Sequence, residues 1–150
     1  MANERDTARS AQDLAEHVRD GMLRNDRASK MLGMQIVDVT PGRATLTMTI
    51  RDEMLNGHDI CHGGLITTLA DSAFAFACNS YNELTVASGF SIDLIAPGAL
   101  GDVLTAECSE VAKAGRAGVY DTLVTNQHGQ RIAAFRGRSH TIKGKPAVKE

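Results

Sequence analysis

The chain has 150 residues, of which 43% are hydrophobic and 23% charged, the composition of an ordinary soluble globular domain. A formal net charge of -2 and the absence of tryptophan argue against the basic, aromatic-rich surface that binds nucleic acid. The charged start MANERDTARS lacks the apolar core of a signal peptide, and the longest apolar run, AFAFAC, is too short to span a bilayer. We therefore expect one domain over residues 1–150, with neither nucleic acid nor a membrane as its partner.

Residues Ala11 to Met31 predict a helix, because apolar side chains recur there at helical spacing among charged ones: Leu14, Val18, Met22 and, as a candidate, Leu32. Gly21 weakens this helix. Two strand-like runs follow, MQIVDVTPG and RATLTMTI, and the second alternates apolar and polar residues. The Pro41–Gly42 pair between them predicts a hairpin, and residues 51–62 are expected to form a loop.

A central helix is expected to begin at Gly63 and to end near Asn79. Four strand-like runs follow it, separated by turn residues: VASGFSIDLIAPG, DVLTAECSEVAKAG, RAGVYDTLVTNQHG and QRIAAFRGRSHTI. The order helix, two strands, long helix, four strands predicts an α+β fold, in which one antiparallel sheet of about six strands curls around the central helix. The final KGKPAVKE segment is expected to be disordered.

The three cysteines, Cys61, Cys78 and Cys108, form no CxxC pair and leave an odd number. This usage fits the reducing cytoplasm better than a disulfide scaffold. We expect a cytoplasmic protein in which each cysteine is a small buried hydrophobe.

The central helix carries an apolar stripe with a carboxylate beside it. The stripe consists of Ile66, Leu69, Ala70, Ala73, Phe74 and Ala77. At about 100° per residue, Asp71 falls beyond the edge of this stripe, near Thr67 and Cys78. A partly buried carboxylate at a subunit contact and a solvent-facing one in a wet groove both remain open. A working base would need a pKa raised above about 3.9, most simply by desolvation.

The start of this helix, Gly63–Gly64, suits a ligand oxygen. Glycines leave room for a ligand, and the first N–H groups of a helix have no internal partner, so they can stabilise an anion or an oxyanion. Tight packing of the helix start is the alternative explanation. Asp71 lies eight residues, about 12 Å, from Gly63 along the helix. The two can therefore serve one carbonyl only if two copies of the helix pack antiparallel in a two-fold dimer.

Several polar residues before the helix have two explanations each. The Asn56 amide can hold a carbonyl or a water, but Asn56–Gly57 is also a strong turn signal. His58, Cys61 and His62 are potential metal ligands, yet no partner pair with zinc spacing follows. Sequence neighbours such as Cys61 and His62 are rarely aligned for nucleophilic catalysis. We expect no metal, and we expect His62 to be a structural residue at the helix entry or one that orders a substrate loop.

A basic cluster is predicted near the later strands. Lys113 and Arg116 flank a glycine at a turn, and Arg136 and Arg138 lie on the last strand. Such a cluster could hold phosphates, whereas exposed turn charges are usually only solvated.

The segments LNGHDICHGG, LADSAFAFACNS, GVYD and FRGRSH, in this order and spacing, resemble the hotdog-fold acyl-CoA thioesterases, and among them the thioesterases of phenylacetate degradation. The resemblance covers about Ala28 to Ile142. It implies a sheet wrapped around one helix, which agrees with the order of elements. It also implies an active site at a dimer interface, commonly in a tetramer of two dimers.

The resemblance also implies roles for the central residues. Asp71 is the catalytic carboxylate, acting as a nucleophile or as a general base for water. Gly63, beside Gly64, is the backbone donor that polarises the thioester carbonyl. Asn56 helps to place the carbonyl or the water, and His62 is the histidine next to this donor.

Binding roles follow for four further residues, of which Gly64 at the helix start is the first. Ser91 lies where relatives carry a hydroxyl that orients water, and Lys113 and Arg116 lie where the phosphates of coenzyme A could dock. The resulting hypothesis is a hydrolase of aryl-acetyl-CoA thioesters such as phenylacetyl-CoA or hydroxyphenylacetyl-CoA, without metal or redox cofactor. A hotdog hydratase or dehydratase and a non-catalytic acyl-CoA-binding module are the alternatives.

Overall fold

The computed structural model describes residues 9–149. In chain order its first elements are helices α1 (Ala11–Asn25) and α2 (Arg27–Met31), strands β1 (Gln35–Thr40) and β2 (Arg43–Thr49), the short 3-10 helix η1 (Asp52–Met54) and helix α3 (Gly63–Asn79). The remaining strands are β3 (Thr85–Leu94), β4 (Val103–Ala114), β5 (Ala117–Thr125) and β6 (Arg131–Thr141). The predicted central helix and all six predicted strands are confirmed.

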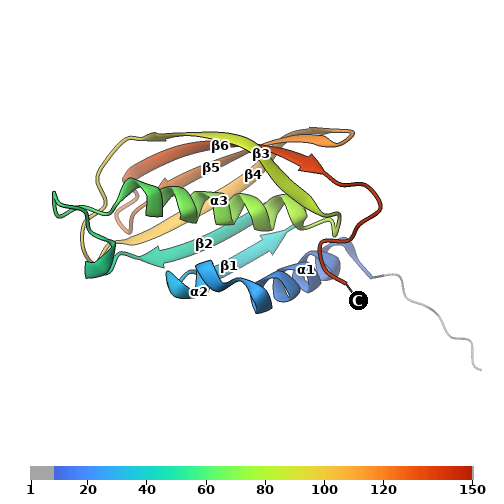
Figure 1. Ribbon diagram of the computed structural model, residues 1–150, viewed down its shortest axis with the longest axis horizontal. Helices are drawn as coiled ribbons and strands as arrows, with labels where there is room; N and C mark the ends of the chain where they lie inside the picture. The colour runs from blue at the N-terminus through green and yellow to red at the C-terminus, as the bar shows by residue number, and fades with distance from the viewer. Residues whose placement is uncertain (1–8, 150) are drawn as a thin grey trace, which may run out of the picture.

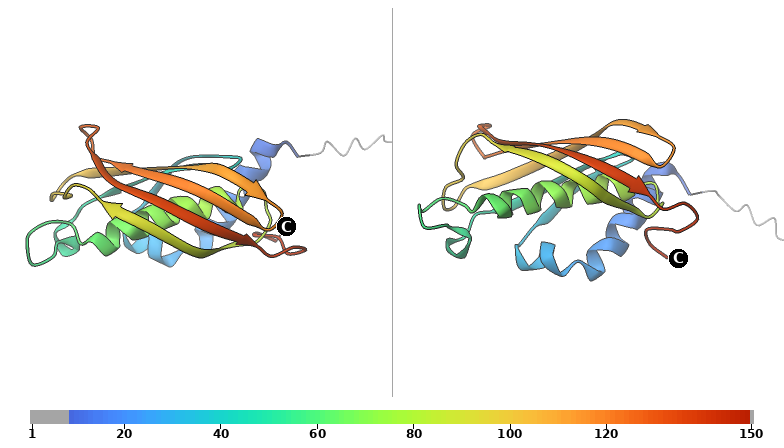
Figure 2. Two further views of the ribbon diagram at one scale, coloured as in Figure 1. Left: turned by 90° about the horizontal axis from the view of Figure 1, so that it is seen from above. Right: turned by 45° about the horizontal axis from the view of Figure 1, so that its top comes forward.

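The six strands form one antiparallel sheet in the order β1-β2-β4-β5-β6-β3. This sheet curves around α3, while α1 and α2 lie near β1 (Figures 1 and 2). After α3 the chain crosses to the far edge of the sheet, so β3 pairs with β6 and not with β4, the next strand along the chain. The predicted α+β architecture, a sheet wrapped around one helix, is confirmed.

The core lies between α3 and the inner face of the sheet. Every residue of the predicted stripe is buried: Ile66, Leu69, Ala70, Ala73, Phe74 and Ala77. The ring of Phe74 packs 5.5 Å from the ring of Tyr120 and 5.9 Å from that of Phe135, measured between centroids. These aromatic contacts join α3 to β5 and β6, and they fix the rotation of the helix against the sheet.

Phe74 also lies directly against the backbone of β6 at Gly137, where an added Cβ would lie 2.9 Å from two ring atoms. We expect Gly137→Ala to lower the free energy of unfolding by about 1–3 kcal/mol, because the buried ring has no free space into which it can move. Urea unfolding measures this change. Gly57→Ala is the matched control, since a Cβ there meets no atom within 4 Å. Equal midpoints for the two variants would contradict the close packing at Gly137.

The N-terminal helix differs from the prediction of one helix to Met31. The backbone of Asp26 is extended (φ -84°, ψ 92°) and ends α1, and its carboxylate then caps the short helix α2. The carboxylate accepts hydrogen bonds from the Ser29 N–H at 2.9 Å and the Ser29 hydroxyl at 2.7 Å. Aspartate competes in this way with the helical hydrogen bonds of the backbone, so the continuous helix was wrong at its last turn.

The prediction of a disordered tail was also wrong for residues 143–149, and Glu150 lies outside the described residues. The Leu84 N–H donates to the Lys145 carbonyl at 2.9 Å, and the Val148 N–H donates to the Asn82 side chain at 2.9 Å. Val148 then packs against Gly21 of α1, where a Cβ would overlap its methyl groups. Gly21 weakens α1 locally but allows this approach, a long-range contact that a polar tail composition does not reveal.

Candidate active site

Helix α3 begins with one unused backbone donor. His62 is the N-cap residue, and its Nδ1 accepts the Gly64 N–H at 3.0 Å. The Leu65 and Ile66 N–H groups both donate to the His62 carbonyl, at 2.9 and 3.4 Å. Of the first four amides of α3, only that of Gly63 has no acceptor among the described residues. His62 therefore has the structural role of a helix entry, and it already occupies the Gly64 amide.

The absence of a side chain at Gly63 also has a packing reason. A Cβ at this position would lie 2.5 Å from Cδ1 of Leu94, at the end of β3. The two explanations of the glycine are therefore compatible, because the same residue permits the approach of β3 and leaves its N–H unpaired.

Asp71 projects from the middle of α3 as a half-buried carboxylate. No hydrogen bond or ion pair joins it to another described residue, and burial raises its pKa above the ordinary value of 3.8. An unpaired carboxylate whose pKa is raised by burial is a better proton acceptor than an ordinary surface carboxylate. Asp71 and Gly63 lie eight residues apart on one straight helix, about 12 Å, so a single chain does not bring them together.

Asn56 forms a turn ahead of the helix. Its side-chain oxygen accepts the His58 N–H at 2.9 Å and the Ile60 N–H at 3.4 Å, and its own N–H donates to the Ile60 carbonyl at 2.8 Å. The turn explanation is thus confirmed for the oxygen. The Nδ2 amino group has no partner in residues 9–149, so it remains available as a donor.

The fold of one chain does not bring Ser91 close to the other residues predicted for the active site. Its neighbour Ile92 packs against the core, so the alternation of β3 directs Ser91 to the outer face of the sheet. There it lies opposite Arg136, whose guanidinium binds Asp121 through two bonds of 2.7 and 2.8 Å. The role of Ser91 in orienting water stays a prediction that one chain does not support.

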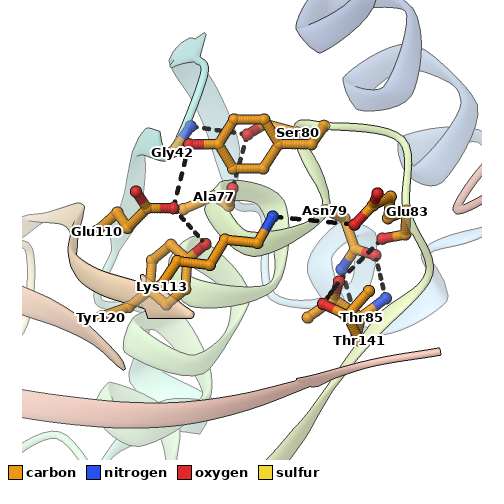
Figure 3. Close-up of polar contacts among 11 residues, drawn as sticks. Gly42, Ala77, Asn79, Ser80, Glu83, Thr85, Glu110, Lys113, Tyr120 and Thr141 are labelled. Carbon is orange, nitrogen blue, oxygen red and sulfur yellow. Dashed lines mark hydrogen bonds and ion pairs between the residues drawn. The ribbon is translucent and has the colours of Figure 1, made fainter. Parts of the chain in front are cut away.

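Lys113 lies at the other end of α3 from Gly63. Its ammonium is 4.2 Å from the centroid of the Tyr81 ring and 3.9 Å from the Glu83 carboxylate (Figure 3). Arg116 is exposed at the turn between β4 and β5. Binding of coenzyme A phosphates by these two residues stays a prediction.

The sequence reasoning missed a polar network at this C-terminal end of α3 (Figure 3). The Asn79 side chain accepts the Thr85 N–H at 2.9 Å and donates to the Thr85 carbonyl at 3.0 Å. The Glu110 carboxylate accepts the hydroxyls of Tyr120 at 3.0 Å and Tyr81 at 3.1 Å. These bonds tie the end of α3 and the segment that follows it to β3, β4 and β5, and no local sequence pattern indicates them.

Two of the hollows on the described surface bear on the candidate site. The larger, about 810 Å³, lies along the outer face of the sheet. Its charged lining residues are Asp38, Asp93, Glu107, Asp121, Arg43 and Arg136. Because carboxylates outnumber guanidiniums and Arg136 is already paired with Asp121, this hollow is unsuited to an anionic ligand. The smaller hollow, about 370 Å³, includes Gly63 in its wall.

Within residues 9–149, no group of three histidine, cysteine, aspartate or glutamate side chains is placed to hold a metal ion. Cys61 is buried, and this burial raises the pKa of its thiol. A raised pKa disfavours the thiolate, so the geometry does not support Cys61 as a nucleophile. None of the helices in these residues combines the length and the apolar character needed to cross a bilayer.

The fold, one sheet wrapped around one helix, is that of the hotdog class. The free amide at the start of this helix and the unpaired carboxylate along it make up the candidate site. The family model of the thioesterase superfamily matches residues 58–133. The chain therefore belongs to the thioesterase superfamily, and the expectations of a hotdog fold and of a thioester hydrolase are confirmed.

Individual relatives agree with this assignment. The chain is 46% identical over 123 residues to the acyl-coenzyme A thioesterase PaaI of Escherichia coli (strain K12), covering 82% of this chain and 88% of that protein. The solved structure of E. coli PaaI, from the phenylacetic acid degradation operon, superposes with a TM-score of 0.89 at 43% identity over 91% of this chain and 99% of that chain. The protein smu.793 of Streptococcus mutans UA159, solved with acetyl CoA, gives a TM-score of 0.72 at 28% identity over 75% and 90%.

Proposed function

We propose that this chain hydrolyses acyl-CoA thioesters to the free acid and coenzyme A, with aryl-acetyl-CoA substrates such as phenylacetyl-CoA or hydroxyphenylacetyl-CoA. The observation that carries the proposal is the pairing of one unused helix-start amide, Gly63, with one unpaired carboxylate, Asp71, in a thioesterase fold. The aryl-acetyl preference is supported by the similarity to E. coli PaaI, and coenzyme A as the carrier by the acetyl CoA bound to smu.793.

Gly63, Asp71 and Asn56 each have a separate role in the proposed reaction. The Gly63 N–H donates to the thioester carbonyl oxygen and stabilises the negative charge that develops there. The Asp71 carboxylate either attacks the carbonyl carbon or takes a proton from the water that attacks it. When water attacks, the C–S bond breaks and the free acid forms directly. When Asp71 attacks, the C–S bond breaks to leave a mixed anhydride between the acyl group and Asp71, and water then hydrolyses it to the free acid and regenerates the carboxylate. In both routes coenzyme A leaves as a thiolate that takes up a proton. The free Nδ2 of Asn56, in the turn ahead of the helix, holds the carbonyl or the water.

We assign this reaction to a homodimer with shared sites. Strand β3 is an edge strand whose apolar side chains are far from buried in one chain: Val86 is 46%, Phe90 42% and Leu94 52% exposed. Pairing of two β3 strands about a two-fold axis would cover this edge and place two α3 helices antiparallel. Asp71 of each chain then approaches Gly63 of the other. Association of two such dimers into a homotetramer is supported by the family resemblance alone.

We place the enzyme in the cytoplasm. All three cysteines are free and buried, which suits a reducing compartment.

Release of free thiol from an acyl-CoA panel tests the activity. The panel comprises aryl-acetyl, benzoyl and straight-chain thioesters, and we expect the highest kcat/KM for the aryl-acetyl members. A hydratase would instead add water to an enoyl-CoA without releasing thiol, and a binding module would bind acyl-CoA without turnover. Either result would refute the hydrolase assignment.

Mixing two inactive variants tests the shared site. Asp71→Asn removes the carboxylate, and Gly63→Pro removes the backbone donor. In a mixed dimer one site carries both lesions and the other carries neither. Since about half of the dimers are mixed when the chains are co-expressed equally, about one quarter of the wild-type activity should return. Co-purification through two different tags isolates the mixed dimers, and the parent variants are the controls. Activity no higher than that of the parents would show that each chain holds a complete site.

A further inference from the structure

The carboxylate of Asp71 has no partner in its own chain that could hold it in place. It makes no hydrogen bond or ion pair with another described residue, and its side chain is only half-buried. Its position therefore depends on how α3 is seated against the sheet. A reacting group that is misplaced by about 1 Å can lose about 10²-fold in rate. The contacts that seat α3 thus matter for the reaction as well as for stability.

A bulge in β4 directs two polar side chains toward α3. Buried Ala106 and Cys108 mark the inner face of this strand, and the alternation places Glu110 on that face as well. The register shifts between Glu110 and Ala112, so Lys113 also faces inward, where it would point outward on a regular strand. The bulge therefore presents a carboxylate and an ammonium to the end of α3 (Figure 3).

Tyr81, two residues beyond the end of α3, is held by both of these side chains. Its hydroxyl donates to Oε1 of Glu110 at 3.1 Å, and its ring centroid lies 4.2 Å from the Lys113 ammonium. The turn between β1 and β2 leaves room for this contact, since a Cβ on Gly42 would lie only 2.8 Å from the Tyr81 hydroxyl. The C-terminal end of α3 is therefore fixed to β4.

The same oxygen of Glu110 also acts on the middle of α3, through Tyr120 of β5. It accepts the Tyr120 hydroxyl at 3.0 Å, and the Tyr120 ring packs 5.5 Å from the ring of Phe74, measured between centroids. Tyr120 and Phe74 are each 1% exposed. Phe74 follows Asp71 by three residues, which is about one helical turn. Through two hydroxyls, one carboxylate thus holds both the end of α3 and the turn that carries Asp71.

Resting on the proposed thioesterase activity, we propose that Glu110 is a positioning residue for Asp71. Glu110 takes no part in the chemistry. It holds Tyr81 and Tyr120, and these two residues hold α3 at the rotation that aims Asp71 at the thioester. Loss of this hold slows the chemical step and leaves the binding of coenzyme A unchanged, because Asp71 acts on the reacting carbon. The effect therefore falls on kcat and not on KM.

Substitutions of Glu110 and its two tyrosines test this role with the best substrate of the acyl-CoA panel. We expect Glu110→Ala to lower kcat by about tenfold or more, with KM within about twofold of the wild-type value. Glu110→Gln should retain most of kcat, because its amide oxygen can still accept the two hydroxyls. Tyr81→Phe and Tyr120→Phe keep the rings and remove one hydroxyl each, so they remain informative if Glu110→Ala fails to fold. Each should lower kcat by about threefold or more, again without a change in KM.

Asp26→Ala is the matched control for a loss of stability alone. It removes the carboxylate that caps α2 through Ser29, and so lowers Tm without touching the contacts of α3. Assayed well below the Tm of every variant, it should keep the wild-type kcat. The inference is overturned if the Glu110→Ala and tyrosine variants also keep the wild-type kcat, if their losses fall on KM, or if Glu110→Gln loses as much as Glu110→Ala. Absence of thiol release by the wild type would instead refute the thioesterase proposal itself.

Discussion

Replacing Asp71 with asparagine is expected to abolish thioester hydrolysis, with a loss in kcat of about 10²- to 10⁴-fold. Asparagine has nearly the same shape as aspartate but can neither accept a proton from water nor attack the carbonyl. Because Asp71 makes no hydrogen bond or ion pair with another described residue, the substitution leaves no partner unpaired. We therefore expect an unchanged oligomer and an unchanged affinity for coenzyme A. Thiol-release kinetics measure the loss, and near-normal turnover would remove Asp71 from the mechanism.

The raised pKa of Asp71 adds a prediction about pH. Burial disfavours the charged carboxylate, so between the ordinary value of 3.8 and the raised folded value the folded protein binds more protons than the unfolded one. Stability therefore falls as the pH rises through this window, and the penalty is complete above it. Asp71→Asn should raise Tm at neutral pH, and the gain should vanish below pH 3.8. Hydrolysis requires the ionised carboxylate, so the acid limb of kcat should lie above 3.8.

Thermal unfolding across pH distinguishes this effect from a merely structural role. If Asp71→Asn lowered Tm at neutral pH, the carboxylate would have a stabilising partner, and the absence of contacts around it would be contradicted.

Replacing Gly63 with proline is expected to lower kcat by about 10²- to 10³-fold, the loss seen when one oxyanion donor is removed. Gly63 is the first residue of α3, where proline fits because the N–H has no helical acceptor. The preceding residue, His62, has φ -57° and ψ 127°, a conformation that proline allows its predecessor. The substitution thus removes the donor and keeps the helix.

Gly63→Ala is the matched control, because it introduces the same Cβ beside Leu94 and retains the N–H. We expect it to lose far less activity than Gly63→Pro, and circular dichroism should show α3 intact in both. Equal losses in the two variants would mean that the space at Gly63, and not its N–H, matters for the reaction.

The elements themselves could be predicted because their signals are local. The apolar stripe of α3 and the alternation of β2 depend on neighbours a few residues apart, and the structure confirms both. The placement of β3 beside β6 depends on contacts across the whole chain, as does the packing of Val148 on Gly21, so neither was predicted. Asp26 did carry a local signal, since aspartate is one of the preferred N-cap residues and competes for the hydrogen bonds of the backbone.

The candidate site was predictable only in part. The free amide of Gly63 follows from its place at a helix start, and the engagement of the Gly64 amide follows once His62 is recognised as the N-cap. The approach of Asp71 to Gly63 requires a second chain, which the geometry of one helix could suggest but not supply. Ser91 was assigned to the site from the family resemblance alone. A resemblance of this kind does not state to which side of a strand a side chain points.

Leu94 takes part both in the proposed association of two chains and in shaping the space beside Gly63. It ends the edge strand through which two chains are proposed to associate, and it also packs on Gly63 and lines the smaller hollow. A substitution of Leu94 selected for tighter association would therefore also change the space beside Gly63, and the reverse holds equally.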